Sequence, residues 1–213
     1  MAGGSNRNEA WQGRVISIQP RIRLTRSFDE RSHSDVGYGL RLDGTIGERG
    51  GEFLVGIGVA AQAQHRFRAG DLVSGESLPV ADPRTECVEF YRTTRLAVVA
   101  RGAEHATAPP PWLGVPPELS GYRARGHRRL DSRTYEAKGR TCIWGCRMPV
   151  ELIVDPWKPW EKRHRLETFC YGPKSCAVYH PGPTRKVPGR RGMTWEEEDR
   201  VDEEATAHRA PDE

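Results

Sequence analysis

The sequence lacks any apolar run approaching the roughly 20 residues that a membrane-spanning helix needs. Its first residues, MAGGSNRNEA, also lack the basic-then-apolar layout of a secretory signal peptide. Aromatic residues make up only 8% of the chain, and the mean hydropathy is −0.70. We therefore expect no membrane association and a cytoplasmic location.

Residues that interrupt long helices are numerous, whereas hydrophobic residues are few. The 213 residues include 23 glycines and 16 prolines, and only 36% are hydrophobic. This composition favours short strands, many turns and some disorder. The length allows one ordinary domain plus a smaller module, so the sequence predicts a mainly β protein built in that way.

The charge is uneven along the chain. The net charge is only +4, but arginines crowd residues 14–31 and 123–133, whereas acidic residues crowd 196–204. A run of like charges with few apolar residues is typical of disordered chain. We expect residues 1–10 to be disordered, and residues 183–213 to form a basic, then acidic, largely disordered tail.

Alternating apolar residues mark five short strands in the first half, with a short helical segment at 60–67 before the turn Gly70-Asp71. They lie at residues 15–24, 38–42, 53–57, 72–80 and 96–99. This layout resembles the OB-fold, a small five-stranded antiparallel barrel, over residues 11–102. Another small antiparallel barrel or sandwich is the alternative. Three consecutive prolines then indicate a stiff linker at 103–118.

Cysteines are few, but four of them pair around tight turns. Cys142 and Cys146 flank one glycine-containing turn, and Cys170 and Cys176 flank another. The residues between the pairs read as a β-hairpin, which would bring the pairs face to face as in a zinc ribbon. We therefore predict a metal-stapled, zinc-ribbon-like hairpin module at 119–182 that holds a structural Zn²⁺.

The cysteine spacings, with three and five intervening residues, are wider than in a common zinc ribbon, so a 4Fe–4S cluster is an alternative. His164 or His180 replacing one thiolate, and four unrelated cysteines, also stay open. Cys87 stands apart and reads as an ordinary buried thiol.

Interleaved basic and aromatic residues suggest contact with single-stranded nucleic acid, whose phosphates attract guanidinium groups and whose bases stack on aromatic rings. Trp144, Trp157 and Trp160 would extend this surface. The candidate residues are Arg21, Arg23, Arg26, Phe28, Tyr38, Arg123, Arg125, Arg128 and Arg129.

No phosphate loop, nucleophile elbow or spaced carboxylate pair indicates an enzyme. The sequence thus favours a non-enzymatic nucleic-acid-binding protein with little sequence preference. One alternative is an adaptor that binds another protein through the acidic tail and the proline-rich linker. A second is an enzyme with an unrecognised site near Asp29, His33 and Asp35, where polar residues are densest.

Overall fold

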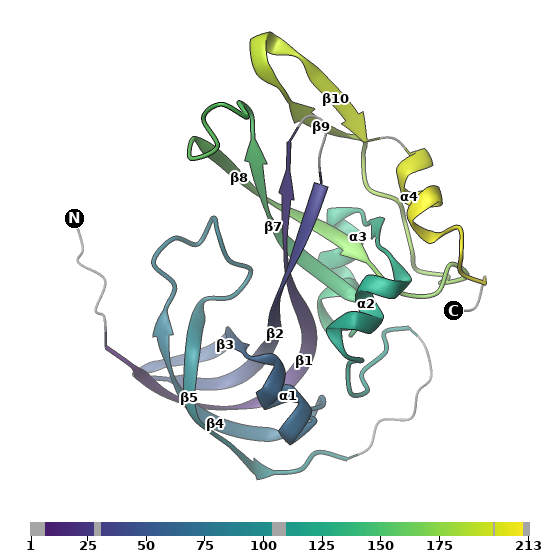
Figure 1. The fold of residues 1–213 in the computed structure, drawn as a ribbon. Coiled ribbons are helices and arrows are strands. Elements are labelled where there is room, and N and C mark those ends of the chain that lie inside the picture. The colour runs from purple at the N-terminus through teal and green to yellow at the C-terminus, as the bar shows by residue number, and fades with distance from the viewer. Residues whose placement is uncertain (1–6, 28–30, 104–109, 198, 211–213) are drawn as a thin grey trace.

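The computed structural model describes residues 7–27, 31–103, 110–197 and 199–210, and it is mainly β (Figure 1). The strands are β1 (Glu9–Arg26), β2 (Arg31–Ile46), β3 (Arg49–Ile57), β4 (Leu72–Pro79), β5 (Phe90–Ala100), β6 (Arg128–Arg129), β7 (Gly145–Ile153), β8 (Lys162–Cys170), β9 (Arg185–Pro188) and β10 (Thr194–Glu197). The helices are α1 (Val59–His65), α2 (Leu119–Arg125), α3 (Ser132–Ala137) and α4 (Asp199–Thr206), with 3₁₀ turns at Gly139–Thr141 and Arg190–Gly192.

All five strands predicted in the first half are present, and the predicted helical segment is α1. The strands belong to a large sheet of order β2-β3-β5-β4-β1-β7-β8-β6, in which β1 also pairs with β2. One bridge, Val55 to Phe90, joins β3 to β5. Apolar side chains that alternate along β1, β2 and β3 pack together in the hydrophobic core on one face of these strands, as period-two patterning predicts.

The β1–β2 pair is longer than the predicted strands and runs beyond the first five. β1 has 18 residues, which at about 3.3 Å per residue span about 60 Å. Its first part pairs with β4, whereas its end, Leu24–Arg26, pairs in parallel with β7. β7 and β8 form the predicted hairpin, and Met148, Val150 and Phe169 pack into the same core as the first half. The predicted module at 119–182 therefore shares its sheet and its core with the predicted barrel.

The region after residue 182 differs from the expected disordered tail. β9 and β10 form a hairpin (Figure 1), and α4 packs against β6. The physical reason is a buried cation: Arg129 is completely buried, and its Nε donates to Asp202 Oδ2 at 3.0 Å. The acidic residues of α4 thus compensate a charge in the folded body instead of repelling each other in water. Within the described residues, no helix is long and apolar enough to cross a bilayer.

Candidate nucleic-acid interface

Of the arginines predicted on the first strand, Arg21 and Arg26 are buried and Arg23 is half-buried. Arg21 is buried and its Nη2 lies 2.8 Å from Glu86 Oε2, while Arg23 Nη2 lies 3.1 Å from Glu86 Oε1. Arg26 is 1% exposed and lies 3.5 Å from a Glu167 oxygen. Because each of the three lies beside a carboxylate, this row does not form the exposed phosphate-binding strip that we expected.

The aromatic partners predicted for that strip do not complete it either. Tyr38 is buried, its hydroxyl donates to the Pro117 carbonyl at 2.8 Å, and burial raises its pKa to about 12. Phe28 lies outside the described residues. Trp144 is half-buried against the core, where its ring lies 5.6 Å from that of Tyr122. Tyr38 and Trp144 thus have structural contacts in the folded protein.

The second arginine group is also largely used inside the molecule. Arg129 is bound to Asp199 and Asp202 of α4, as described above. Arg128 is buried, lies 3.9 Å above the Tyr179 ring and donates to the Pro173 carbonyl.

The other two arginines of that group are nearer to solvent. Arg125 lies 4.4 Å above Trp144 and donates to the Tyr171 carbonyl. The Arg123 side chain is 61% exposed and pairs with Asp35. Arg123 is therefore the member of the group that best fits the predicted role.

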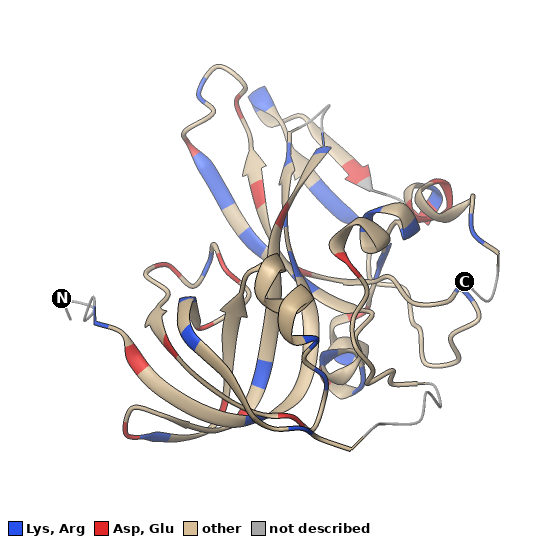
Figure 2. Ribbon diagram, turned by 60° about the horizontal axis from the view of Figure 1, so that its bottom comes forward, with Lys and Arg blue, Asp and Glu red and all other residues tan. Residues whose placement is uncertain are grey.

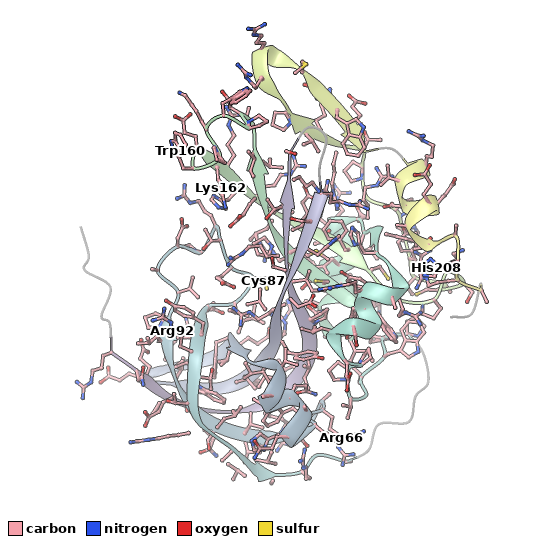
Figure 3. The ribbon with its side chains drawn as sticks, in the orientation of Figure 1. Arg66, Cys87, Arg92, Trp160, Lys162 and His208 are labelled. Carbon is pink, nitrogen blue, oxygen red and sulfur yellow. The ribbon has the colours of Figure 1, made fainter. Side chains whose placement is uncertain are left out.

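A different part of the molecule combines exposed aromatic rings with cations. We call it the double-hairpin surface: residues 155–163, in the β7–β8 connection and the start of β8, and residues 186–196 of the β9–β10 hairpin. Trp157 is 75% exposed and Trp160 is 73% exposed, and Met193 is exposed as well. Figure 1 shows both hairpins at one end of the molecule, and Figure 3 shows Trp160 and Lys162 projecting from the first of them.

Local turn chemistry explains why the tryptophans are presented to solvent. Asp155 Oδ1 accepts a hydrogen bond from the Trp157 amide at 3.0 Å, and the Asp155 carbonyl accepts from Lys158 at 2.9 Å. Pro156 and Pro159 alternate with the tryptophans, and fixed proline φ angles suit such turns. An ion pair of 3.2 Å between Asp155 Oδ1 and Arg190 Nε holds the second hairpin beside the first.

The double-hairpin surface is basic. It contains six cationic side chains and three carboxylates, Asp155, Glu161 and Glu196, so its net charge is +3. The Lys and Arg segments of these hairpins and of β8 are blue in Figure 2. The cations are Lys158, Lys162, Arg163, Lys186, Arg190 and Arg191. The sequence indicated both tryptophans and a basic stretch after residue 183, which includes Lys186, Arg190 and Arg191, but it did not indicate that the two lie together. The run Asp155-Pro-Trp-Lys-Pro-Trp160 carried the signal for the first hairpin, because turn residues there alternate with tryptophans that no core periodicity explains.

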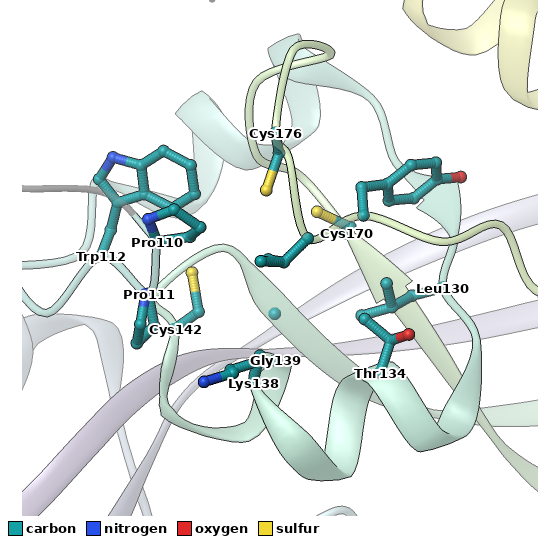
Figure 4. A pocket seen from close by; sticks show the side chains of 13 residues that line it. Pro110, Pro111, Trp112, Leu130, Thr134, Lys138, Gly139, Cys142, Cys170 and Cys176 are labelled. Atoms are coloured by element: carbon teal, nitrogen blue, oxygen red, sulfur yellow. The ribbon is translucent and has the colours of Figure 1, made fainter.

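The four predicted metal ligands do not share one pocket. The sulfurs of Cys142, Cys170 and Cys176 face a small pocket that Trp112 and Pro110 also line (Figure 4). In the β7–β8 register Cys170 lies opposite Gly145, whereas Cys146 lies opposite Phe169. Because successive residues of a strand face opposite sides, Cys146 points away from that pocket, and its thiol donates to the Pro20 carbonyl at 3.4 Å.

The closed four-sulfur arrangement is therefore not assembled as predicted. Among the described residues, no group of three or more His, Cys, Asp and Glu side chains is placed to hold a metal ion. All five cysteines are free thiols, and Cys87 is half-buried. Burial raises the pKa of Cys142 to about 11 and raises that of Cys170, although the Gly172 amide at 3.3 Å and the nearby Arg128 oppose the shift at Cys170.

The polar group suggested for an enzyme is partly described. His33 and Asp35 line a cavity beside α2, together with His127 and Arg123. Asp29 and Glu30 lie outside the described residues.

No family model, no curated protein and no solved structure matches this chain. The function is therefore argued from the arrangement of its own residues.

Proposed function

We propose that this protein binds single-stranded DNA or RNA without catalysis and with little sequence preference, through the double-hairpin surface. The observation that carries the proposal is the exposure of Trp157 and Trp160 among six cations on two hairpins joined by the Asp155–Arg190 ion pair. Burying one tryptophan removes about 150–250 Å² from water, worth about 4–6 kcal/mol at about 25 cal/mol/Å². Two such rings left in solvent on a basic surface suit a ligand that stacks bases and carries phosphates.

The scaffold that we propose is OB-like. What supports this is the order of pairing, in which β1 joins β2, β2 joins β3, β3 joins β5, β5 joins β4, and β4 returns to β1. The pairing between β3 and β5 is the shortest of these, because it consists of the single bridge between Val55 and Phe90. The double-hairpin surface lies outside these five strands, so the ligand would bind to the part of the sheet that extends beyond the barrel. We keep the expected cytoplasmic location as part of the proposal, which the five free thiols support.

Binding of a fluorescein-labelled oligonucleotide, followed by fluorescence anisotropy, tests the proposal. Base stacking contributes about 1–3 kcal/mol per base, so replacing Trp157 or Trp160 by alanine should weaken binding by about 5- to 150-fold. Val99→Ala is the matched control, because Val99 is an exposed apolar residue of β5 outside the surface. Equal affinities for the tryptophan variants and the control would remove the proposal.

The dependence of affinity on salt gives a second, independent measurement. For single strands the slope of log affinity against log salt is about −0.7 for each neutralised phosphate. The net charge of +3 and the six cations of the surface then bracket the expected slope between about −2 and about −4. A slope near zero would show that phosphates are not contacted, and would indicate a protein ligand for the tryptophans.

The adaptor alternative has less support from the described parts of its two segments. α4 of the acidic tail is docked on Arg129, and the Trp112 carbonyl of the linker accepts a hydrogen bond from the Ile143 amide at 2.9 Å. These described parts therefore contact the folded body. A protein ligand for the double-hairpin surface is the conclusion if the salt dependence of oligonucleotide binding is near zero.

We also propose that the thiol pocket holds a stabilising metal, either Zn²⁺ or a 4Fe–4S cluster, with Cys142, Cys170 and Cys176 as its ligands. Three soft donors facing one pocket support the proposal, whereas Cys146 lies on the other face of the sheet. The three thiols are not placed as ligands of one ion in this structure, so metal binding would have to draw them together. Elemental analysis of the purified protein should find metal that is lost in Cys142→Ser and Cys176→Ser but retained in Cys146→Ser. Metal-free wild type, or loss of metal in Cys146→Ser alone, would contradict this ligand set.

A further inference from the structure

A second site lies away from the double-hairpin surface, in a cavity of about 230 Å³ between the start of β2, α2 and α4. The polar residues that line it are Arg31, His33, Asp35, Arg123 and His127. This volume is below the roughly 300–1,000 Å³ of pockets that take drug-sized ligands. The cavity therefore suits one small group instead of a whole nucleotide.

Two histidines meet at the cavity. The ring centroids of His33 and His127 are 5.2 Å apart with an interplanar angle of 67°. His127 is 5% exposed and is held between Phe169, at 4.5 Å, and Tyr171, at 5.8 Å. Among the described residues, neither ring has a hydrogen-bond partner for its buried Nε2. Buried polar atoms in folded proteins are nearly always paired, so two unpaired ring nitrogens beside one cavity indicate a ligand.

The charge around these rings selects the sign of that ligand. Burial first, and then Arg31, Arg26 and Arg123, lowers the pKa of His33 to about 4, with Asp35 opposing. Burial and then His33, Arg31, Arg26 and Arg185 lower the pKa of His127.

Two arginines, Arg31 and Arg123, line the cavity beside the two histidines, and the one carboxylate among the lining residues is Asp35. This lining disfavours a metal cation and favours an anion.

We propose that this cavity binds a phosphate group, with Arg31 and Arg123 facing its oxygens and the imidazoles of His33 and His127 donating to them. A guanidinium group matches phosphate geometry through paired N–H donors. Arg123 reaches the cavity from α2 and its side chain is 61% exposed, so it can turn from Asp35 to an incoming anion. The phosphate belongs either to a nucleic-acid strand end or to a small free metabolite.

Titration with inorganic phosphate, followed by NMR at the Cε1–H signals of the two histidines, tests the site. Wild type should show saturable shifts of both signals. Arg31→Gln and, separately, Arg123→Gln should each weaken binding at least fivefold. Arg133→Gln, which removes an exposed arginine of α3 outside the cavity, should leave the affinity unchanged. Shifts that do not saturate in the wild type, or equal affinities in all four proteins, would overturn the proposal.

The pH dependence of binding separates this site from a simple cationic patch. Sulfate stays a dianion between pH 5 and 8, so a change in its affinity reports protonation of the protein. If a bound anion returns the pKa of His33 from about 4 to the ordinary 6.5, sulfate should bind up to about thirty-fold more tightly at pH 5 than at pH 8. A pH-independent affinity would exclude the histidines from the site.

Competition distinguishes the two sources of the phosphate. A 5′-phosphorylated oligonucleotide that displaces inorganic phosphate, when its unphosphorylated copy does not, identifies a strand end. Displacement by a mononucleotide but by neither oligonucleotide identifies a free metabolite, and displacement by both oligonucleotides alike would refute a monoester site. The Trp157→Ala, Trp160→Ala double variant should bind phosphate like the wild type, so this site and the double-hairpin surface can fail separately.

Discussion

Removing Asp202 should destabilise the protein far more than removing Asp199, although both acidic residues pair with Arg129. The Arg129 side chain is 0% exposed, and Asp202 Oδ2 accepts from both its backbone amide and its Nε at 3.0 Å. Asp202 itself is 10% exposed, whereas Asp199 is 78% exposed. Asp202→Ala therefore leaves a buried guanidinium and a buried amide without their shared acceptor.

The expected magnitude follows from the burial of the pair. Breaking a buried ion pair by removing one partner costs about 3–5 kcal/mol, whereas an exposed pair contributes about 0–1 kcal/mol. We expect Asp202→Ala to lower the free energy of unfolding in urea by about 3 kcal/mol, and to lower Tm by about 6–12 °C for a chain of this size. Asp199→Ala is the control in the same helix, and it should lose about 1 kcal/mol or less. Equal losses in the two variants, or none in either, would show that α4 is not docked on Arg129.

Three further predictions concern other parts of the molecule. The pKa of His33 is about 4 in the folded protein, below the ordinary 6.5, so the unfolded chain binds the proton first as pH falls. The free energy of unfolding should therefore fall as pH drops from about 6.5 to about 4, and His33→Gln should make this fall smaller. Urea titrations at each pH measure it, and the same pH profile in the variant and the wild type would contradict the prediction. Gly44→Ala should lower the free energy of unfolding by about 1–3 kcal/mol, because a Cβ there would lie 2.1 Å from the Gln12 carbonyl oxygen. Gly50→Ala is the control and should lower it by less than 1 kcal/mol, because the nearest atom to its Cβ is 3.9 Å away. Calorimetry compares the two variants, and equal losses would refute the close approach at Gly44. Asp155→Ala should weaken oligonucleotide binding by releasing the Trp157 turn and Arg190, even though it removes a negative charge, whereas Glu161→Ala should strengthen binding; if both strengthen it, charge alone controls the affinity.

The strands could be predicted because their alternation is local, whereas the pairings between distant segments could not. Tyr38, Leu40 and Leu42 carry the period of two that marks β2, and all three are buried. Nothing in the sequence near Leu24 indicates that it pairs with Val150, which lies 126 residues along the chain. That pairing joins the two predicted modules into one sheet.

The cysteine prediction shows how a register decides a site. A hairpin with one cysteine pair at each end does bring Cys142, Cys170 and Cys176 to one pocket. The side on which Cys146 lies depends on whether it pairs with Cys170 or with Phe169, and a slip of one residue moves a side chain to the other face. Turn spacing in the sequence does not fix that register, so the fourth ligand could not be placed.

The prediction that the arginines of the first strand are exposed was wrong for a related reason. Arg21 and Arg23 alternate with Ile22 and Leu24, as in a strand with one face in solvent, but Arg21 is buried and Arg23 is half-buried. Glu86, in the segment between β4 and β5, lies over Arg21 and Arg23, and the carboxylate of Glu167 lies beside Arg26.

A basic composition therefore overstates the charge that this protein presents to a ligand, because several guanidinium groups compensate buried carboxylates and carbonyls. Among the described residues, cations gather at the double-hairpin surface and around the histidine cavity. The double-hairpin surface also exposes Trp157 and Trp160, so we propose strand binding there and the binding of a single phosphate in the cavity.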